Sequence, residues 1–433
     1  MLHITDDDRR RRLAIRHGLV RRFGAIEDAV RGMTVLHATE AATVHLSLWA
    51  RVAGVTVAEV DSALYDERSV VKQLAMRRTL FVFPRDLLPA ALGSAAARVA
   101  RQQVTDATKR LADGGVVSGD AIRPWLDEAT AAVRDLLADG VARTTREIRD
   151  QVPALDVRIS TGGGPDKKWG GDLPIAPVVM ALLSAQGDVM RAVNAGHWRF
   201  NKPAWTTTKH WLGEVPTPLE EHEGYAELVR RWLATFGPGT EADIVWWLGG
   251  TKTAVRRALA DVEAVEVSLD GGATGWVLPD DTEPAGPAPA SGAGAAAMAP
   301  AGRGPADEVG AGGAGRRAPE GGEPWAALLP SLDPTVMGWK ERDFYLDPAD
   351  KPYLFDTNGN AGNTAWWNGR IVGCWVQDPD DSAAPVRLVI HDDVGKQAHK
   401  ALEAEAERLT DWLDGVRITN VYASPQMRGL RLP

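Results

Sequence analysis

Residues 225–278 have the sequence YAELVRRWLATFGPGTEADIVWWLGGTKTAVRRALADVEAVEVSLDGGATGWVL. Apolar side chains recur at helical spacing over 225–236 and predict a first helix, which ends at the Gly-Pro-Gly that follows. Thr240, with Asp243 three residues later, is a capping-box pattern that predicts the start of a second helix. This second helix is expected to stop at Gly249-Gly250, just before a third.

The third helix is amphipathic, and a hairpin follows it. Thr251 is its expected N-cap, and its outward face carries the cations Lys252, Arg256 and Arg257. Two short strands, 265–269 and 276–278, flank a turn-rich segment. This order of elements is that of a winged helix, and the cations suit a helix that contacts DNA. We therefore predict a winged-helix unit over 213–282, with a small helical packing module as the alternative.

The same order recurs more weakly upstream. A helix over 174–186 and strands over 189–193 and 197–200 predict a second winged-helix-like unit, 86–212, whose wing lies near 189–200. The tip of this wing offers Arg191, Trp198 and Arg199 as candidate DNA contacts. The alternative for Trp198 is an ordinary packed position.

A first unit is predicted over residues 1–85. Helices are expected over 40–52, 57–65 and 68–75, and a strand over 79–83 that ends at a proline. Arg77 and Arg78 precede this strand. They are candidates for contacts to DNA phosphates, or they solvate the edge of the strand.

The clearest boundary lies at 283–323, which is almost entirely Ala, Gly and Pro. Such a segment cannot bury enough apolar surface to offset its ordering entropy, so a disordered linker is predicted. In the C-terminal unit, 324–433, the Asn368-Gly369 pair predicts a tight hairpin. A strand over 386–391 and an amphipathic helix over 394–413 follow. The predicted fold class is α+β and helix-rich, with tandem winged-helix units and a small C-terminal α/β-containing domain.

Composition narrows the function classes. The 433 residues carry a net charge of −9, which argues against purely electrostatic binding of nucleic acid, although arginines cluster near the N-terminus. A single cysteine, Cys374, excludes a disulfide framework. No signal-peptide pattern and no apolar run of membrane length is visible. We expect a cytoplasmic monomer without metal or cofactor. The glycines 162–164 with Lys167 and Lys168 lack P-loop spacing and are expected to form a flexible basic loop.

Several motifs, in order along the chain, resemble the AlkZ/YcaQ-type DNA glycosylases. They are Val35-Leu36-His37-Ala38-Thr39, His45-Leu46-Ser47-Leu48-Trp49-Ala50-Arg51, Leu74-Ala75-Met76-Arg77-Arg78-Thr79-Leu80-Phe81, Phe236-Gly237-Pro238-Gly239-Thr240 with Asp243, Trp246 and Trp247, Leu329-Pro330-Ser331-Leu332-Asp333-Pro334, Gly338-Trp339 and Asn358-Gly359-Asn360. The resemblance implies tandem winged helices around double-stranded DNA and hydrolysis of the N-glycosidic bond of alkylated or bulky-adduct bases. It also implies a phosphate contact at Arg77.

The catalytic motif of that family is a glutamine, an apolar residue, and then glutamine or aspartate. The matching positions here are His37, Ala38 and Thr39, so both polar positions differ. Neutral His37 could accept a proton from the attacking water, since its reference pKa is about 6.5. Thr39 could hold that water in line. The alternatives are structural: Thr39 as the N-cap of the helix from Glu40, and His37 as an ordinary buried histidine.

The leading hypothesis is therefore a monofunctional DNA glycosylase for DNA repair, or for self-resistance to DNA-damaging agents, with His37 and Thr39 as its catalytic pair. The alternative is a non-catalytic DNA-binding protein, a regulator or lesion sensor on the same scaffold. In a third hypothesis the winged helices bind other proteins, which the acidic net charge allows.

Overall fold

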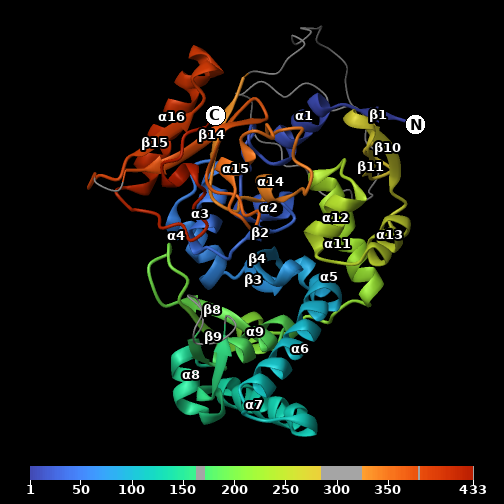
Figure 1. The fold of residues 1–433 in the computed structure, drawn as a ribbon, viewed down its shortest axis with the longest axis vertical. Coiled ribbons are helices and arrows are strands. Elements are labelled where there is room, and N and C mark those ends of the chain that lie inside the picture. The colour runs from blue at the N-terminus through green and yellow to red at the C-terminus, as the bar shows by residue number, and fades with distance from the viewer. Residues whose placement is uncertain (162–170, 284–323, 379–380, 433) are drawn as a thin grey trace, which may run out of the picture.

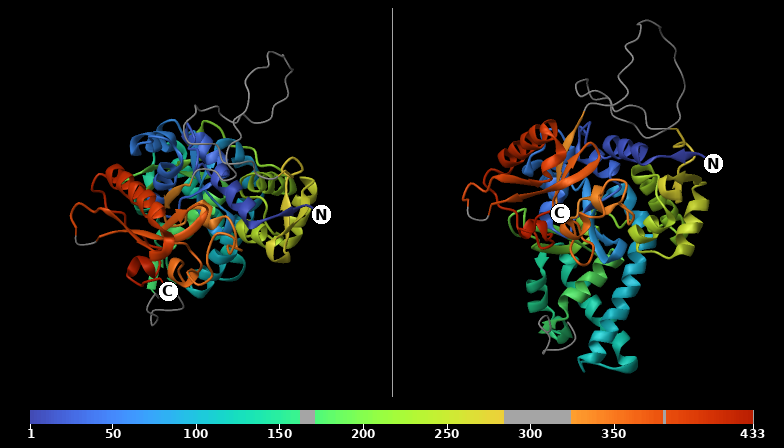
Figure 2. Two further views of the ribbon diagram at one scale, coloured as in Figure 1. Left: turned by 90° about the horizontal axis from the view of Figure 1, so that it is seen from above. Right: turned by 45° about the horizontal axis from the view of Figure 1, so that its top comes forward.

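The computed structural model describes residues 1–161, 171–283, 324–378 and 381–432. The predicted linker, apart from Glu283, and the predicted basic loop with Lys167 and Lys168 lie outside these ranges. The fold mixes helices and sheets, as expected. Figure 1 shows a body that holds both termini and a lobe of α6–α9 that projects from it; the second view of Figure 2 shows the same projection.

The N-terminal part of the body contains a small antiparallel sheet in the order β2-β4-β3. Its elements are β1 (His3–Ile4), α1 (Asp6–Arg16), α2 (Ile26–Gly32), β2 (Leu36–His37), α3 (Ala41–Arg51), α4 (Val57–Asp61), β3 (Val70–Ala75) and β4 (Thr79–Pro84). The helices expected over 40–52 and 57–65 are confirmed, the second with a π-helical turn at Ser62–Asp66.

The helix expected over 68–75 is wrong, because this segment is strand β3. Arg68 has a φ of 57°, a left-handed conformation that ends helical geometry. Val70–Ala75 then pairs with β4 along its whole length. All but one of its residues are buried, so the alternation that identifies a half-exposed strand is missing.

The projecting lobe has a core of its own, which runs from Ala107 to Trp205. Its elements, with the two short helices at its junction with the body, are α5 (Leu88–Ala91), α6 (Ala97–Asp113), α7 (Ile122–Leu136), β5 (Arg143–Thr144), α8 (Thr145–Gln151), β6 (Arg158–Thr161), β7 (Gly171–Pro174), α9 (Ala176–Gln186), β8 (Val189–Asn194), β9 (Pro203–Thr207) and α10 (Thr208–Leu212). One sheet has the order β5-β9-β8.

The strand expected over 197–200 is wrong. These residues form a turn, in which the Phe200 N–H donates to the His197 carbonyl at 2.8 Å. The backbone pair Ala195–Lys202 closes the hairpin at 2.7 Å, so the second strand begins only at Pro203. Proline is tolerated as the first residue of a strand.

The segment quoted first folds in the predicted order of elements. It forms α11 (Glu221–Phe236), α12 (Glu241–Leu248), α13 (Lys252–Asp261), β10 (Val265–Leu269) and β11 (Thr274–Val277). The capping box of Thr240 with Asp243 and the N-cap at Thr251 are both present. Strand β1 pairs in parallel with β10, which gives the sheet order β1-β10-β11. The sequence alone did not predict this third strand.

The C-terminal part is an antiparallel sheet in the order β12-β13-β14-β15, with α16 packed against it. Its elements are β12 (Ala326–Leu329), α14 (Pro334–Met337), α15 (Lys351–Leu354), β13 (Thr364–Trp367), β14 (Arg370–Gln377), β15 (Val386–Ile390) and α16 (Lys396–Leu413). The predicted hairpin is confirmed. Asn368 and Gly369 have φ values of 47° and 82°, the positive values that a tight two-residue turn requires.

The body is held together by one core that includes residues from α1 to α16. At its centre, Asp333 at the N-terminus of α14 accepts two hydrogen bonds from the Arg51 guanidinium, at 2.6 and 2.8 Å. Both side chains are completely buried. The Ser47 hydroxyl also donates to Asp333, at 2.8 Å, and Thr335 accepts from Arg51 at 2.7 Å. This network fastens the C-terminal sheet to helix α3.

Candidate functional site

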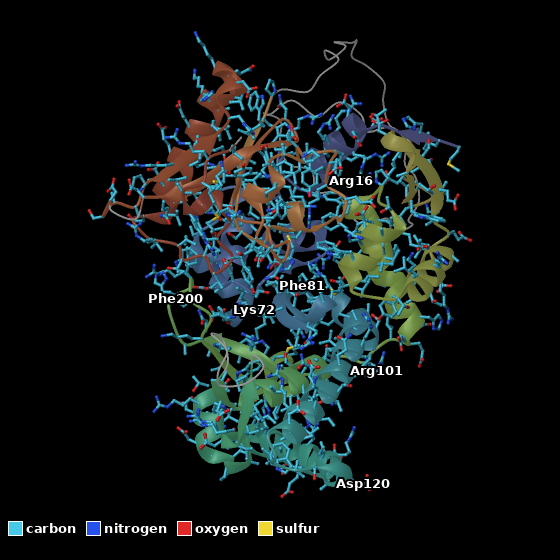
Figure 3. The ribbon with its side chains drawn as sticks, in the orientation of Figure 1. Arg16, Lys72, Phe81, Arg101, Asp120 and Phe200 are labelled. Carbon is cyan, nitrogen blue, oxygen red and sulfur yellow. The ribbon has the colours of Figure 1, made fainter. Side chains whose placement is uncertain are left out.

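The segment His37-Ala38-Thr39 lies where strand β2 leads into helix α3. His37 pairs with Phe81 of the central strand β4, and the Ala38 N–H continues the ladder to Leu80. In Figure 3, Phe81 lies near the middle of the molecule, close to where the lobe joins the body. The His37 ring is 5% exposed and contacts the Phe81 ring at 4.5 Å between centroids.

Thr39 does not cap helix α3, so the structural alternative proposed for it is wrong. The N-cap is Glu40, and the helix begins at Ala41. The Glu40 carboxylate does not cap the helix; it accepts a hydrogen bond from the Tyr422 N–H at 2.8 Å. Burial raises the pKa of Glu40. The Thr39 hydroxyl is buried and has no hydrogen-bond partner among the described residues. Its capacity to form hydrogen bonds is therefore unused within the described part of the chain.

His37 has one ring nitrogen engaged and one free. Its Nε2 lies 3.2 Å from Nη2 of Arg77. Arginine only donates, so Nε2 accepts and the proton of the neutral ring is on Nδ1. Burial, and then the charge of Arg77, hold the pKa of His37 well below its usual 6.5. The Nδ1–H is buried without a partner in the described part of the chain.

Arg77 lies at the turn between β3 and β4 and is held from several sides. Its φ of 55° is left-handed, a conformation that bulky residues adopt rarely and that points to local constraint. Its guanidinium stacks over the Trp246 ring of α12 at 4.1 Å. Gly249 packs against it, since a Cβ there would meet the Arg77 Cγ at 3.0 Å. Burial, and then the neighbouring Arg342, lower the pKa of Arg77 to about 10.

Arg78 differs from its neighbour. It is exposed and forms an ion pair with Asp106 of α6. Its φ of 59° is also left-handed. Arg78 therefore projects over the junction with the lobe, away from the contacts of Arg77.

The three candidates on the predicted second wing occupy different environments. Arg191 donates to Asn201 at 2.9 Å and stacks over Trp205 at 4.8 Å. Trp198 is 8% exposed and packs against His45 and Trp412, as its structural alternative predicted.

Arg199, the third candidate, donates to the carbonyl of Arg417. The turn that carries it also reaches the catalytic candidates: the Asn201 amide contacts the Thr39 carbonyl at 3.5 Å.

The cations of α13 are exposed and form a separate group. In Figure 1, α13 lies at the outer side of the body, away from β2. Arg256 pairs with Glu241 at 2.6 Å, and Arg257 pairs with Asp261 at 3.7 Å. Lys252 lies 3.9 Å from Glu241. Carboxylates therefore partly neutralise the face that the sequence presents as basic.

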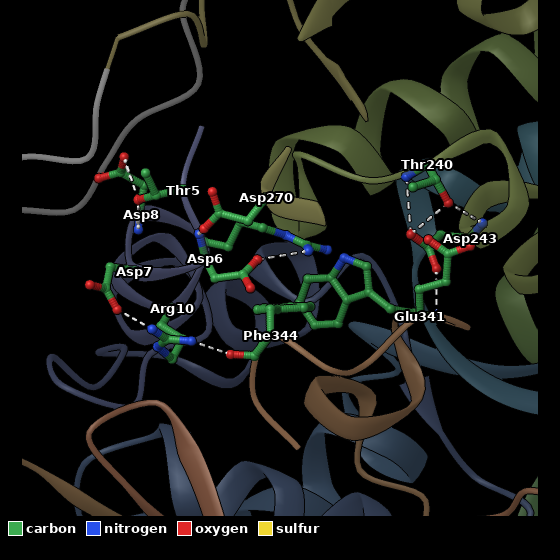
Figure 4. A network of polar contacts seen from close by, with 12 residues as sticks. Thr5, Asp6, Asp7, Asp8, Arg10, Thr240, Asp243, Asp270, Glu341 and Phe344 are labelled. Carbon is green, nitrogen blue, oxygen red and sulfur yellow. Dashed lines mark hydrogen bonds and ion pairs between the residues drawn. The ribbon is translucent and has the colours of Figure 1, made fainter. Parts of the chain in front are cut away.

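The N-terminal arginines are also paired. Arg10 binds Asp7 and the Phe344 carbonyl, as Figure 4 shows beside the Thr240–Asp243 capping box. Arg12 and Arg16 both contact Asp281. These cations connect α1 to neighbouring segments and do not form a free basic patch.

The sequence did not indicate a buried lysine on β3, near strand β8. Lys72 on β3 is 9% exposed, and its Nζ donates to the Tyr65 hydroxyl at 2.7 Å. The charged groups that act on it are Arg191 and, more weakly, Asp61. Burial, and then Arg191, lower the pKa of Lys72 to about 8. The sequence predicts a helix over 68–75, and on a helix this lysine would be expected at the surface; in strand β3 it is buried.

We expect this lysine to make stability rise with pH. Its pKa is lowered in the folded chain, so between about pH 8 and 10.5 the unfolded chain binds more protons, and stability increases as pH rises. The gain between pH 8 and 9 should be about 1 kcal/mol. Urea unfolding of the wild type and of Lys72→Met at both pH values measures it. If the two proteins gain equally, the lysine is not responsible.

Within residues 1–161, 171–283, 324–378 and 381–432, no helix is long and apolar enough to cross a membrane. The same ranges hold no group of three His, Cys, Asp or Glu residues that could bind a metal ion.

One family model matches most of the chain. The family model described as DNA glycosylase AlkZ-like matches residues 30–412. Among solved structures, Streptomyces sahachiroi DNA glycosylase AlkZ has a similar fold, with a TM-score of 0.65 and 20% sequence identity. The likeness covers 96% of this chain and 99% of that one. No curated protein gives a significant match.

Proposed function

Since this chain belongs to the AlkZ-like DNA glycosylase family, we propose that it is a monofunctional glycosylase that hydrolyses the N-glycosidic bond of alkylated or bulky-adduct bases in duplex DNA. Such an activity serves base excision in DNA repair, or self-resistance to DNA-damaging agents. His37 and Thr39 are the proposed catalytic pair.

The observation that carries this proposal is a pair of buried polar groups without partners, the Nδ1–H of His37 and the Oγ1 of Thr39. Buried polar groups in folded proteins are nearly always hydrogen-bonded. His37 and Thr39 lie two residues apart, where strand β2 ends and the chain bends toward helix α3. A water molecule between the two groups would satisfy both, and hydrolysis requires a water in a fixed position.

The chemistry needs little more than this position. A purine alkylated on a ring nitrogen is already cationic, so it leaves as a neutral base without a general acid. The oxygen of the water then bonds to the anomeric carbon of the oxocarbenium-like sugar, and the proton that this oxygen loses passes to solvent. We propose that Thr39 accepts a hydrogen bond from this water and that His37 donates one from Nδ1. The low pKa of His37 and its engaged Nε2 favour this positioning role over proton abstraction.

The proposed DNA contacts form two groups. Arg77, Arg78, Arg191 and Arg199 are expected to bind the strand near the lesion. The exposed cations of α13, Lys252, Arg256 and Arg257, are expected to bind phosphates farther along the duplex, after exchange of their carboxylate partners. The packing of Trp198 supports a role beneath the wing in preference to direct contact.

The wider architecture is proposed on the same basis. The order helix, helix, helix and hairpin over α11–β11 supports a winged helix. We propose three such units, over 1–85, 86–212 and 213–282. We also propose a cytoplasmic monomer, held at the nucleoid through DNA binding, that needs no metal or cofactor.

The direct test is release of the modified base from duplexes that carry an N7-alkylated purine or a bulky adduct, with the unmodified duplex as control. We expect abasic sites, detected by alkaline strand cleavage, only in the modified duplexes. Binding to every duplex without release would establish the alternative, a non-catalytic regulator or lesion sensor. Absence of salt-dependent binding would favour protein contacts instead.

A further inference from the structure

Two arginines from distant parts of the chain stack on one tryptophan. The guanidinium carbon of Arg77 lies 4.1 Å from the centroid of the Trp246 ring, and that of Arg342 lies 5.1 Å from it. Arg77 comes from the β3–β4 turn, Trp246 from α12, and Arg342 from the C-terminal part between α14 and α15. The cluster therefore joins three segments beside His37, which Arg77 contacts directly.

Neither cation has an anionic partner. Among the described residues, the side chains of Arg77 and Arg342 contact His37, the Val336 carbonyl and aromatic rings, and none of these contacts is with a carboxylate. The buried carboxylate nearby, Asp243, uses Oδ1 for the N–H groups of Lys340 and Glu341, and Oδ2 for Thr240. Glu341 lies beside Asp243, where burial and then that carboxylate raise its pKa. The charges of the two arginines are thus not compensated by the groups around them.

Both guanidinium groups also keep unused donors. Arg342 is 6% exposed, and its Nε donates to the Val336 carbonyl at 3.1 Å, but its Nη2 has no partner. The Nε of Arg77 has none either. Arg342 also stacks on Phe355 at 4.8 Å. Buried donors without partners are rare, and a buried cation without an anion is costly.

We infer that Arg77 and Arg342 form a binding site for a phosphate group and that its occupant is one phosphodiester of the DNA strand that carries the lesion. A phosphodiester supplies one negative charge and several acceptor oxygens, which match two planar guanidinium groups. Arg77 is partly exposed, so the group can approach from solvent. The choice of DNA as the source rests on the proposed function; the phosphate chemistry rests on the arginine pair alone.

This site gives the C-terminal part a direct role. The phosphate beside His37 would fix the sugar that lies next to it, so Arg342 acts as a positioning residue for the nucleotide. Arg51 and Asp333 hold the segment that carries Arg342 against α3.

The test uses the full chain and Arg342→Gln, with Arg387→Gln as matched control. Arg387 lies on β15 of the same C-terminal sheet, is 58% exposed and pairs with Asp378. First, inorganic phosphate is titrated against chloride at constant ionic strength, and the unfolding temperature is recorded. Phosphate should stabilise the wild type and Arg387→Gln. Loss of a charge-assisted bond should weaken phosphate binding by about tenfold or more in Arg342→Gln.

Second, duplex affinity is measured against salt concentration. The slope of log K against log salt should become shallower by about 0.9 in Arg342→Gln, the loss of one phosphate contact. Arg77→Gln should behave in the same way, which covers the case in which Arg342→Gln does not fold. Circular dichroism checks the fold of each variant.

Equal stabilisation of all variants by phosphate would overturn the site. If phosphate binding is lost but the salt slope of the variants is unchanged, the site takes free phosphate, and the assignment to DNA is overturned. If both effects occur and the wild type releases no base, the phosphate site stands and the glycosylase proposal fails. The two proposals therefore fail separately.

Discussion

Replacement of Asp333 by alanine is expected to lower the free energy of unfolding by about 3–5 kcal/mol, the usual effect of removing one partner of a buried ion pair. The reason is that Arg51 remains completely buried without a counter-charge. Asp333→Ala also removes the acceptor for Ser47 and the cap of α14. Urea unfolding, followed by the fluorescence of the 16 tryptophans, measures the loss.

Two controls make this prediction specific. Asp127→Ala breaks an exposed ion pair with Arg123, and it should change stability by less than about 1 kcal/mol. The double variant Arg51→Met with Asp333→Leu removes both charges and should be more stable than Asp333→Ala alone. If Asp333→Ala unfolds at the same urea concentration as Asp127→Ala, the pair does not stabilise the contact between α3 and the C-terminal part.

The second large effect is expected at the catalytic pair. Thr39→Val keeps the shape of the side chain and removes the hydroxyl that is proposed to hold the water. Misplacement of a reacting group by about 1 Å can cost about 100-fold, so we expect a fall of that size in single-turnover base release. Duplex affinity should be unchanged, because the hydroxyl is buried.

His37 offers a matched pair of variants. His37→Phe removes the ring N–H groups and should slow base release by about 100-fold as well. His37→Gln keeps an N–H donor at this position, so it should keep most of the rate. If His37→Phe is slow and His37→Gln is not, a general loss of packing around Phe81 is excluded as the cause.

The pH profile separates positioning from proton abstraction. The pKa of His37 lies well below 6.5 because of burial and the charge of Arg77. A neutral ring therefore persists as pH falls through 6.5, and base release should be level between about pH 6.5 and 8. A rate that drops through pH 6.5 would contradict this environment and would favour His37 as the base.

Local signals in the sequence predicted much of the secondary structure. Thr240 with Asp243 capped α12, and Asn368-Gly369 formed the hairpin turn, because both patterns act through neighbours a few residues away. Strand β3 was missed, since burial of nearly all of its residues removes the period-two pattern. The strand expected at 197–200 failed because the hairpin turn is longer than the sequence suggested.

The candidate site was only half visible in the sequence. His37, Thr39 and Arg77 were selected by their resemblance to family motifs. Arg342 and Lys72 could not be, because their roles depend on which distant residues lie next to them. No local pattern indicates that Arg342 stacks on Trp246, 96 residues earlier in the chain, or that Lys72 lies beside Arg191.

The ion pair of Arg51 and Asp333 also has a consequence for synthesis of the protein. Its partners are separated by 282 positions. At about 5–20 residues per second, a ribosome needs roughly 15–60 s to add the second partner after the first. The guanidinium of Arg51 on α3 therefore stays hydrated until the last quarter of the chain, which carries Asp333, has emerged. Release of the nascent chain before that point would leave an apolar surface that chaperones are expected to cover.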